Sequence, residues 1–477
     1  MPAGVQVLEG GPVPTLEHLH LADALAATAR RYPASGITCQ APTGAAGRRS
    51  YAEQLTVGAA VASRLRAAGI GPRQPVLIGE LPNRLLIDAF WGCQLADAVP
   101  VVLPPGQPER TGQHALAADG DELTVLELPD RPPYELAGLG TAAVVCYTAG
   151  GGGQRRAIAL SHQQILSRVA GTAAHNGWDA TERSYNFLPL RHVSGLLMFH
   201  VRDVLLGIEQ VHDLPAAALA DPLAMLARLV ETGATLSWLT PPLLRGLADR
   251  LAAVGAGTVP VPGQLRTLML GGDRVDAAHI ESVERLAGLR PGVIVPGYGL
   301  TEAGSGITSA GAGYERPVAG LAPVGWPEPG TSVRVRYEPG SALGDIELTG
   351  PSCGRPDSWL ATGDVGVLGE AGLTVLGSKA DVLVGPDRAW HAAELEQVLG
   401  TLAWQNPELL VACPSPDEPA AVLLYLHPAD LTGPSARRAR PLIAERTGLR
   451  LAALRPLPAS GVPRAAHGKP LRRLLVG

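Results

Sequence analysis

The chain has 477 residues, of which 46% are hydrophobic and 17% are charged, and its formal net charge at pH 7 is −5. This length and composition predict two or three compact units with sizeable cores and exclude a wholly disordered polymer. The slight acidity gives no reason to expect a nucleic acid or an anionic membrane as a partner. Arginines interrupt the longest apolar stretches, so we expect none of them to span a membrane.

The five cysteines include no CxxC pair. Their odd number and wide spacing argue against a zinc ribbon, a redox dithiol and a disulfide scaffold. The first residues also lack the basic segment and following apolar run that are typical of a signal peptide. We therefore expect a cytoplasmic protein.

The first two thirds of the chain alternate between helical and extended patterns. Apolar residues at helical spacing predict helices, and short apolar runs bounded by turn residues predict strands. In chain order these are helices 21–33 and 51–69, strand 75–83, helix 84–98, strands 99–105 and 141–147, helix 161–176, strands 184–190, 235–241 and 265–272, helix 281–289 and strand 293–300. Such alternation predicts a parallel sheet with helices on its faces.

The last third of the chain has a different pattern. From about residue 331, short alternating segments separated by turns predict a smaller antiparallel region. A helix at 392–402, a strand at 420–428 and a helix at 436–448 predict a small α+β unit. The expected fold class is therefore α/β, with a large N-terminal domain of layered αβ sheets at 1–376, a β-rich subdomain within it at about 320–376, and a small, mobile α+β C-terminal lid domain at 377–477.

A run of glycines lies in the stretch YTAGGGGQRRAIALSH (147–162), which leads from a predicted strand to a predicted helix. Consecutive glycines let backbone N–H groups face an anion, and two arginines follow closely. On its own, the run predicts a phosphate-binding loop no more strongly than a flexible connection. The four glycines are Gly150, Gly151, Gly152 and Gly153.

Aligned without gaps, this stretch resembles the phosphate loop YTSGTTGxPKGVxxSH of the adenylate-forming superfamily, which includes acyl-CoA synthetases, peptide-synthetase adenylation domains and luciferases. Further motifs that resemble those of the family follow in the family's order: LPLRHVSGL (188–196), LRTLMLGG (265–272), GYGLTE (297–302), ATGD (361–364), GSKADVLV (377–384) and PRAAHGKPLRR (463–473). Several ordered motifs are far more specific than any one of them. The resemblance covers nearly the whole chain, and it is strongest to small acyl- or aryl-CoA ligases such as o-succinylbenzoate–CoA ligase.

The resemblance implies an ATP-dependent, AMP-forming ligase that activates a carboxylic acid as its acyl-adenylate and releases pyrophosphate. The acyl group would then pass to a thiol or an amine, in specialised biosynthesis of natural products such as antibiotics. The implied cofactors are ATP and Mg²⁺, with CoA or carrier-protein pantetheine as a less certain acceptor. The implied partners are a small carboxylic acid as the substrate and a carrier protein or an amine as the acceptor. The enzyme itself would be a monomer or a homodimer.

The matching motifs also imply roles for individual residues. Glu302 would hold Mg²⁺ through a carboxylate oxygen, which is a ligand type that this ion prefers. Thr301 would donate to the α-phosphate, Tyr298 would pack near the adenine, and Asp364 would accept hydrogen bonds from the ribose hydroxyls. The other implied nucleotide-binding residues are Thr148, Gly150, Gly151, Gly152, Gly153, Arg156, Gly297, Gly299 and Ser378.

Lys469 is the residue that the resemblance makes central, because the matching lysine bridges the substrate carboxylate and the α-phosphate. Only Lys379 and Lys469 are lysines among 39 basic residues, and a compact ammonium suits that role better than a guanidinium. For Lys379, at a variable position, a solvated lysine is the better interpretation. His192 would lie near the acyl pocket, although a lone histidine is more often structural.

The chain also departs from the family pattern. Ala149, Gly151 and Gly152 replace a serine and two threonines whose hydroxyls would bind the β- and γ-phosphates, so ATP binding or the first step should be weakened. Ser378 replaces an arginine expected at the ribose. Pro386 changes a loop that lines the pantetheine channel in thioester-forming relatives.

These departures leave two alternatives open. One is a catalytically impaired homologue that binds a ligand or a partner protein. The other is an ATP-dependent enzyme that activates a non-standard substrate. LPLRHVSGL has no acid where amino-acid-activating domains carry an aspartate for the substrate's amino group, which disfavours an α-amino acid.

Overall fold

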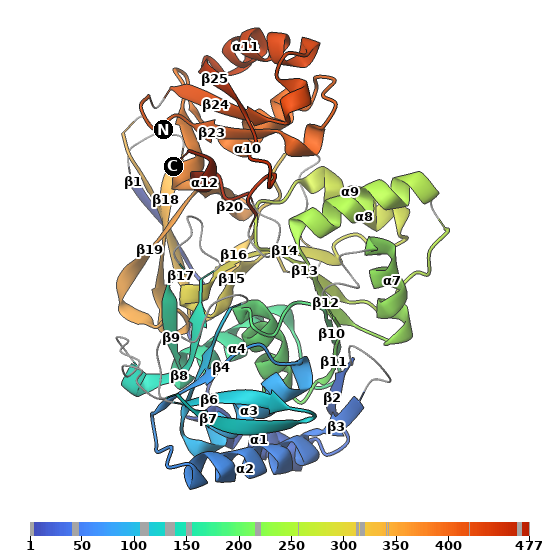
Figure 1. Cartoon of the computed structure of the whole chain (residues 1–477), viewed down its shortest axis with the longest axis vertical. Helices are drawn as coiled ribbons and strands as arrows, with labels where there is room; N and C mark the ends of the chain where they lie inside the picture. The colour runs from blue at the N-terminus through green and yellow to red at the C-terminus, as the bar shows by residue number, and fades with distance from the viewer. Residues whose placement is uncertain are drawn as a thin grey trace.

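The computed structural model describes residues 4–40, 47–104, 114–128, 139–148, 155–214, 221–255, 257–311, 314, 320–339, 341, 343–418, 420–464 and 470–476. These residues form sheets of nine, six, five, three and two strands. In Figure 1 the first helices lie at one end of the long axis, and the C-terminal elements lie at the other. No helix within the described ranges has the length and hydropathy needed to cross a membrane.

The six-stranded sheet has the order β7-β6-β4-β5-β8-β9 and a parallel centre. Its strands are β4 (Pro75–Ile78), β5 (Val99–Val102), β6 (His114–Asp119), β7 (Glu122–Glu127), β8 (Ala142–Tyr147) and β9 (Ala157–Ser161), and the nearby helices are α1 (Leu21–Arg31), α2 (Tyr51–Ala67), α3 (Asn83–Ala96) and α4 (His162–Asn176). Apolar faces of these helices and strands form a shared core. The predicted helices and the strands at β4, β5 and β8 are confirmed, whereas the β6–β7 hairpin and β9 were not predicted.

The nine-stranded sheet has the order β16-β15-β14-β13-β12-β10-β11-β2-β3 and is parallel from β14 to β2. Its strands are β2 (Gly36–Cys39), β3 (Gly47–Ser50), β10 (Arg183–Asn186), β11 (Glu209–His212), β12 (Leu236–Leu239), β13 (Thr267–Leu270), β14 (Ile294–Leu300), β15 (Ser305–Ser309) and β16 (Trp326–Pro327), with helices α5 (Arg202–Leu206), α7 (Pro222–Glu231), α8 (Pro241–Val254) and α9 (Ala277–Leu286). The carboxyl ends of β13 and β14 point toward the loops where parallel sheets usually bind ligands.

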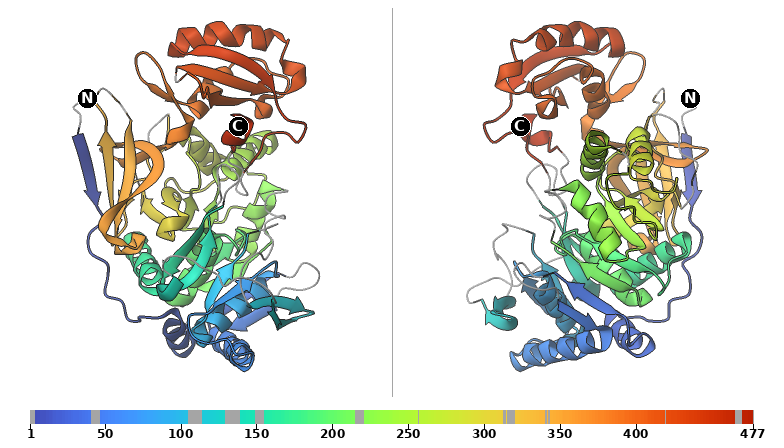
Figure 2. Two further views of the ribbon diagram at one scale, coloured as in Figure 1. Left: turned by 60° about the vertical axis from the view of Figure 1, so that its left-hand side comes forward. Right: turned by 90° about the vertical axis from the view of Figure 1, so that its right-hand side faces the viewer.

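The five-stranded antiparallel sheet has the order β1-β17-β18-β19-β20. Its strands are β1 (Gly4–Glu9), β17 (Ser332–Tyr337), β18 (Gly344–Gly350), β19 (Arg355–Gly369) and β20 (Gly372–Ser378). The predicted antiparallel texture after residue 331 is confirmed. The structure adds β1, which pairs with β17 from the far end of the chain and lies beside these strands in Figure 2.

The C-terminal unit, defined here as the elements from β21 to α12, has its own hydrophobic core. It contains β21 (Val382–Val384), β22 (Ala389–His391), α10 (Ala392–Leu399), β23 (Val411–Pro414), β24 (Ala421–Leu426), α11 (Pro434–Thr447), β25 (Arg450–Pro456) and α12 (Arg473–Val476). Its three-stranded sheet is separate from the larger sheets in both views of Figure 2. The boundary at 376/377 falls within β20, and the mobility of this unit stays a prediction.

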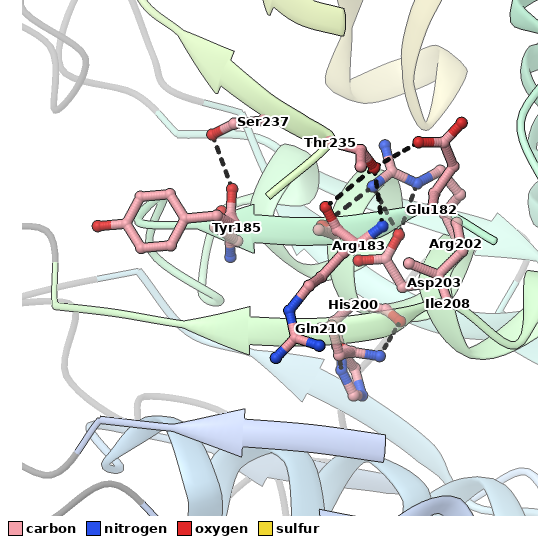
Figure 3. A network of polar contacts seen from close by, with 12 residues as sticks. Glu182, Arg183, Tyr185, His200, Arg202, Asp203, Ile208, Gln210, Thr235 and Ser237 are labelled. Carbon is pink, nitrogen blue, oxygen red and sulfur yellow. Dashed lines mark hydrogen bonds and ion pairs between the residues drawn. The ribbon is translucent and has the colours of Figure 1, made fainter. Parts of the chain in front are cut away.

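A buried polar network supports the nine-stranded sheet (Figure 3). The Nε1–H of Trp91 donates to Nε2 of His200 (2.8 Å), which leaves the His200 Nδ1–H to donate to Oε1 of Gln210 (2.8 Å). Burial lowers the pKa of His200 to about 4. The side chain of Arg202 forms an ion pair with Asp203 (2.6 Å), and neither side chain is exposed. These side chains are buried and make their hydrogen bonds to one another, which indicates a structural role, although Nη1 of Arg202 and Oδ2 of Asp203 have no hydrogen-bond partner among the described residues.

Candidate functional site

A cleft of about 370 Å³ lies where the ends of β13 and β14 meet β19, β20 and the C-terminal unit. Its lining brings together five of the residues that the sequence motifs single out, although they are separated by up to 81 positions in the chain. They are Gly297, Tyr298, Gly299, Asp364 and Ser378. Their individual roles remain predictions.

Tyr298 and Asp364 form the centre of this cleft. The Tyr298 hydroxyl donates to Oδ2 of Asp364 (2.7 Å), and the Asp364 N–H donates to the Thr362 hydroxyl oxygen (3.0 Å). Burial and the neighbouring Asp364 carboxylate raise the pKa of Tyr298 well above its ordinary value. Tyr298 therefore stays a neutral donor that orients the Asp364 carboxylate.

Gly299 lets the backbone of β14 approach the next segment closely. A Cβ at this position would lie 2.0 Å from the carbonyl oxygen of Ser305, which leaves no room for a side chain. Ser305 itself has a φ of +103°, a backbone conformation that is unusual for a residue other than glycine. The turn around Thr301 and Glu302 is thus tightly constrained.

Thr301 and Glu302 begin a single 3₁₀ turn (Thr301–Ala303) directly after β14. Thr301 is 8% exposed. The Glu302 backbone carbonyl accepts a hydrogen bond from Nε2 of Gln164 on α4 (2.9 Å), and its carboxylate Oε1 pairs with Nη2 of Arg156 (2.5 Å). Two predicted residues from distant motifs, Arg156 and Glu302, therefore meet.

The base of the glycine loop is closed by Thr148 and Arg156. The Thr148 N–H donates to the Arg156 carbonyl (2.9 Å), and the Arg156 N–H donates to the Thr148 hydroxyl oxygen (3.1 Å). Residues 149–154, which include Gly150, Gly151, Gly152 and Gly153, lie outside the described residues.

The expected direct passage from this loop into a helix is corrected by the structure. The loop is followed by β9, which pairs antiparallel with β8 in a register that places Tyr147 opposite Ala157. Helix α4 begins only at His162, where the Ser161 hydroxyl oxygen caps it by accepting from the Gln164 N–H (3.1 Å). Small and β-branched residues in Ala157–Ser161 suit a strand at the edge of a sheet.

The carboxylate in the turn after β14 fits the ion that the resemblance implies. Mg²⁺ prefers hard oxygen ligands and is usually held by one or two carboxylates together with substrate phosphates and water. Glu302 supplies one carboxylate, with 18% of its side chain exposed. The described part of the chain holds no cluster of three His, Cys, Asp or Glu side chains, so nucleotide phosphates and water would complete the coordination.

His192 lies two residues before Ser194, which contacts the strand that follows the Glu302 turn. It precedes a π-helix (Ser194–Val201), and its Nδ1 accepts a hydrogen bond from the Ser194 N–H (3.3 Å). The Ser194 hydroxyl contacts the Ser305 hydroxyl (3.0 Å). A π-helix is rare and often marks a functional site, and periodicity could not have distinguished it from an α-helix.

Apolar side chains adjoin Gly306 in β15 and Gly271 after β13. A Cβ at Gly306 would lie 3.8 Å from Cε of Met198, within ordinary contact distance. A Cβ at Gly271 would lie 3.0 Å from Cζ2 of Trp238 and 2.9 Å from the Gly297 carbonyl oxygen. The ends of β13 and β14 thus form a tight surface beside an aromatic ring.

Lys469 lies outside the described residues, but the described residues that follow it line the cleft. Arg464 and Pro470 form an antiparallel bridge, and Pro470, Leu471, Arg472 and Arg473 line the cleft. Arg472 is 5% exposed and pairs with Asp381 (3.3 Å) and Glu396 (2.8 Å). It anchors this segment to the C-terminal unit.

Three residues at or near the site were missed or only partly foreseen in the sequence. The motif containing Arg472 was recognised without a role for this residue, because its partners lie 76 and 91 positions away. Arg274, three residues after Gly271, lines the cleft with no sequence signal beyond its place in a turn. Lys379 is 56% exposed and pairs with Asp345 (2.8 Å), a contact that the interpretation as a solvated lysine did not include.

The AMP-binding enzyme family matches residues 119–354. Microperfuranone synthase of Emericella nidulans is 26% identical over 417 residues, which cover 74% of this chain and 44% of that protein. Atromentin synthetase greA of Suillus grevillei is 24% identical over 332 residues, which cover 62% of this chain and 34% of that protein. The chain spans less than half the length of these curated relatives.

Solved structures share the fold over nearly the whole chain. The McyG A-PCP complex with phenylalanyl-adenylate superposes with a TM-score of 0.79 at 20% identity, covering 98% of this chain and 84% of that one. An adenylation domain of a keto acid-selecting NRPS module, bound to keto acyl adenylate, gives 0.69 at 21% identity and covers 96% and 100%. The o-succinylbenzoate CoA synthetase MenE of Bacillus subtilis gives 0.69 at 19% identity and covers 95% and 98%. The predicted α/β fold class is confirmed.

Proposed function

We propose that the chain is an AMP-binding, adenylate-forming enzyme, which uses ATP to convert a carboxylic acid into an acyl-adenylate with release of pyrophosphate. The observation that carries this proposal is the cleft, where Tyr298 and Asp364 lie beside the turn of Thr301 and Glu302. The neutral Tyr298 hydroxyl and the oriented Asp364 carboxylate suit the nucleoside of a nucleoside triphosphate. The turn of Thr301 and Glu302, next to the Arg156 cation, suits its phosphates.

The reaction forms a bond between a substrate carboxylate oxygen and the α-phosphorus and breaks the bond to the β-phosphate oxygen, whose electron pair leaves with pyrophosphate. Asp364 accepts from the ribose hydroxyls, and Tyr298 keeps that carboxylate in place. Thr301 donates to the α-phosphate. Mg²⁺ held by Glu302 would supply positive charge to the phosphate oxygens.

The Arg156 guanidinium can pair either with the Glu302 carboxylate or with the phosphates of a bound triphosphate. In the structure it neutralises Glu302, and its side chain is 71% exposed. When a triphosphate enters, the guanidinium turns to the phosphates and frees the Glu302 carboxylate. The stabilisation of the leaving pyrophosphate then comes from Arg156 and from backbone N–H groups, in place of the hydroxyls that the loop lacks.

Lys469 places its ammonium between the attacking carboxylate and the α-phosphate. The neighbouring segment supports this role, since Pro470 lines the cleft and Arg472 is fixed by two carboxylates. An ammonium that contacts the α-phosphate only in the transition state speeds the reaction but does not tighten binding of ATP in the ground state.

The substrate that fits best is a carboxylic acid without an α-amino group and with an apolar or aromatic side chain, such as a 2-keto acid. Val193 and Ser194 follow His192 without an acidic residue that could hold an ammonium. Two apolar side chains lie beside glycines at the ends of the strands: Trp238 beside Gly271, and Met198 beside Gly306. The likeness to an adenylation domain bound to a keto acyl adenylate supports the same class.

The acceptor that we favour is the pantetheine thiol of a carrier protein in natural-product biosynthesis, within the cytoplasm. The relatives are named as natural-product synthetases, and one similar structure contains an A-PCP pair. Pro386 lies in the loop that lines the pantetheine channel in thioester-forming relatives, so its missing backbone donor affects CoA and carrier-protein pantetheine alike and does not decide between them.

A catalytically impaired homologue is the second candidate. The Arg156–Glu302 pair and the missing loop hydroxyls favour it, because both oppose productive binding of Mg²⁺ and ATP. One experiment decides between the two: pyrophosphate release is measured across a panel of 2-keto, aryl, fatty and amino acids with Mg²⁺-ATP. The ligase predicts acid-dependent release, strongest with an apolar 2-keto or aryl acid. No release with any acid, together with calorimetric binding of ATP, favours the impaired homologue.

A further inference from the structure

Arg274 connects the core to the C-terminal unit. It leaves the turn after β13, and its Nη2 donates to Oε1 of Gln397 on α10 (3.3 Å). Nε2 of Gln397 donates in turn to Oδ2 of Asp276 (3.2 Å), whose other oxygen caps helix α9 by accepting from the Ala278 N–H (2.9 Å). This chain of three side chains, from here on the clasp, bridges the two parts of the molecule.

The second terminal nitrogen of Arg274 is free. Nη1 is buried and has no hydrogen-bond partner among the described residues. The side chain lines the cleft together with Tyr298 and Asp364. Burial lowers the pKa of Arg274, while Glu394 and Asp273 oppose that shift. A buried donor without a partner is costly unless a ligand completes it.

We propose that Arg274 couples nucleotide binding to the position of the C-terminal unit, with Nη1 donating to an acceptor of the bound nucleoside while Nη2 holds Gln397. The proposal rests on the proposed function, since it takes the nucleoside to lie at Tyr298 and Asp364. The planar guanidinium presents donors in fixed directions, so one side chain serves both partners at once. Because coupling is reciprocal, a docked C-terminal unit also tightens nucleotide binding.

AMP is the probe, because it carries the nucleoside and needs no acid substrate. Its dissociation constant is measured by calorimetry, and the C-terminal unit is monitored by the rate of tryptic cleavage at Lys379 and Arg388. In the wild-type chain, saturating AMP should slow this cleavage. Arg274→Ala should weaken AMP binding by about tenfold, the loss of one charge-assisted hydrogen bond, and abolish the protection.

Gln397→Ala separates the two halves of the clasp. Gln397 is exposed, so its removal leaves the fold intact, and Nη1 of Arg274 keeps its direct contact. This variant should weaken AMP binding less than Arg274→Ala does and still lose the protection. Arg285→Ala removes an equal charge from the exposed face of α9 and should match the wild type in both measurements.

The outcomes distinguish this inference from the proposed function. Wild-type affinity in folded Arg274→Ala, or full AMP protection in Gln397→Ala, overturns the clasp. If Arg274→Ala fails to fold, the tryptic protection of Gln397→Ala by AMP decides on its own whether the clasp exists. If the wild-type chain binds AMP but releases no pyrophosphate with any acid, the proposed reaction is overturned. The AMP measurements on the variants still test the clasp in that case. A wild-type chain that does not bind AMP overturns both.

Discussion

Nη2 of Arg156 lies 2.5 Å from Oε1 of Glu302, so a phosphate-loop cation neutralises the carboxylate proposed for Mg²⁺. The Arg156 side chain is 71% exposed, and an ion pair so open to solvent is worth at most about 1 kcal/mol. Triphosphate oxygens can therefore displace Glu302 from the guanidinium. Binding of the nucleotide and of the metal should consequently depend on each other.

Arg156→Ala should act in opposite directions on the two ligands. Loss of a charge-assisted contact to phosphate raises the KM for ATP by roughly tenfold. Release of Glu302 lowers the Mg²⁺ concentration for half-maximal pyrophosphate release by up to about fivefold, which corresponds to the energy of an exposed pair. Titrations of Mg²⁺ at saturating ATP test this. Arg155→Ala is the charge-matched control, and an unchanged Mg²⁺ dependence in Arg156→Ala would contradict the role of the pair.

The glycine loop gives a gain-of-function prediction. Its base is held by the hydrogen bonds between Thr148 and Arg156, a geometry that suits a phosphate loop. The double change Gly151→Thr with Gly152→Thr restores two hydroxyl donors and should tighten ATP binding by roughly tenfold. Calorimetry with ATP measures it. Loss of activity with an intact fold would show that the glycines serve another purpose.

His200 makes stability dependent on pH. Burial lowers its pKa to about 4 in the folded chain, whereas an unfolded histidine titrates near 6.5. Below about pH 6.5 the unfolded chain binds the additional proton, so the free energy of unfolding falls as the pH falls toward 4. The loss from this one group reaches about 3 kcal/mol. Denaturant unfolding between pH 7 and 4.5 measures this slope.

His200→Gln should reduce that slope by its own share, because burial also lowers the pKa of His162 and of His212, and it can lower stability at pH 7 by disturbing Trp91 and Gln210. The partly exposed His279→Gln is the matched control and should keep the wild-type slope. A wild-type slope in His200→Gln would show that another group governs the acid sensitivity.

Local patterns predicted much of the fold, and the failures have physical causes. Helices such as α2 have a capping box and apolar periodicity, both of which are visible in the sequence. Strand β1 was missed because five of its six residues are exposed and its partner strand begins 328 positions after it starts. Pairing over such distances leaves no local signal.

The site was predicted only where motifs carry it. Tyr298 and Asp364 meet in the cleft as their motifs imply, while the contact of Arg156 with Glu302 depends on tertiary structure. Arg274 and Arg472 act through partners in the C-terminal unit. No periodicity or spacing could show those contacts.

Lys469→Ala should lower the single-turnover rate of pyrophosphate release by roughly 100- to 1,000-fold, similar to the loss of other transition-state charge stabilisers. ATP binding should change little, because the ammonium reaches the α-phosphate only as the reaction proceeds. The residues that follow Lys469 support this proposal, since Pro470 lines the cleft and Arg472 is anchored by Asp381 and Glu396.

Two variants sharpen this prediction about Lys469. Lys469→Arg should also fail, because a planar guanidinium cannot bridge the carboxylate and phosphate oxygens from the same position. Lys379→Ala is the matched control: it breaks only an exposed pair with Asp345, worth at most about 1 kcal/mol, and should leave the rate nearly unchanged. Equal losses at the two lysines, or no loss at Lys469, would remove the support for an active adenylating enzyme, since the charge proposed at the α-phosphate would then have no measurable effect.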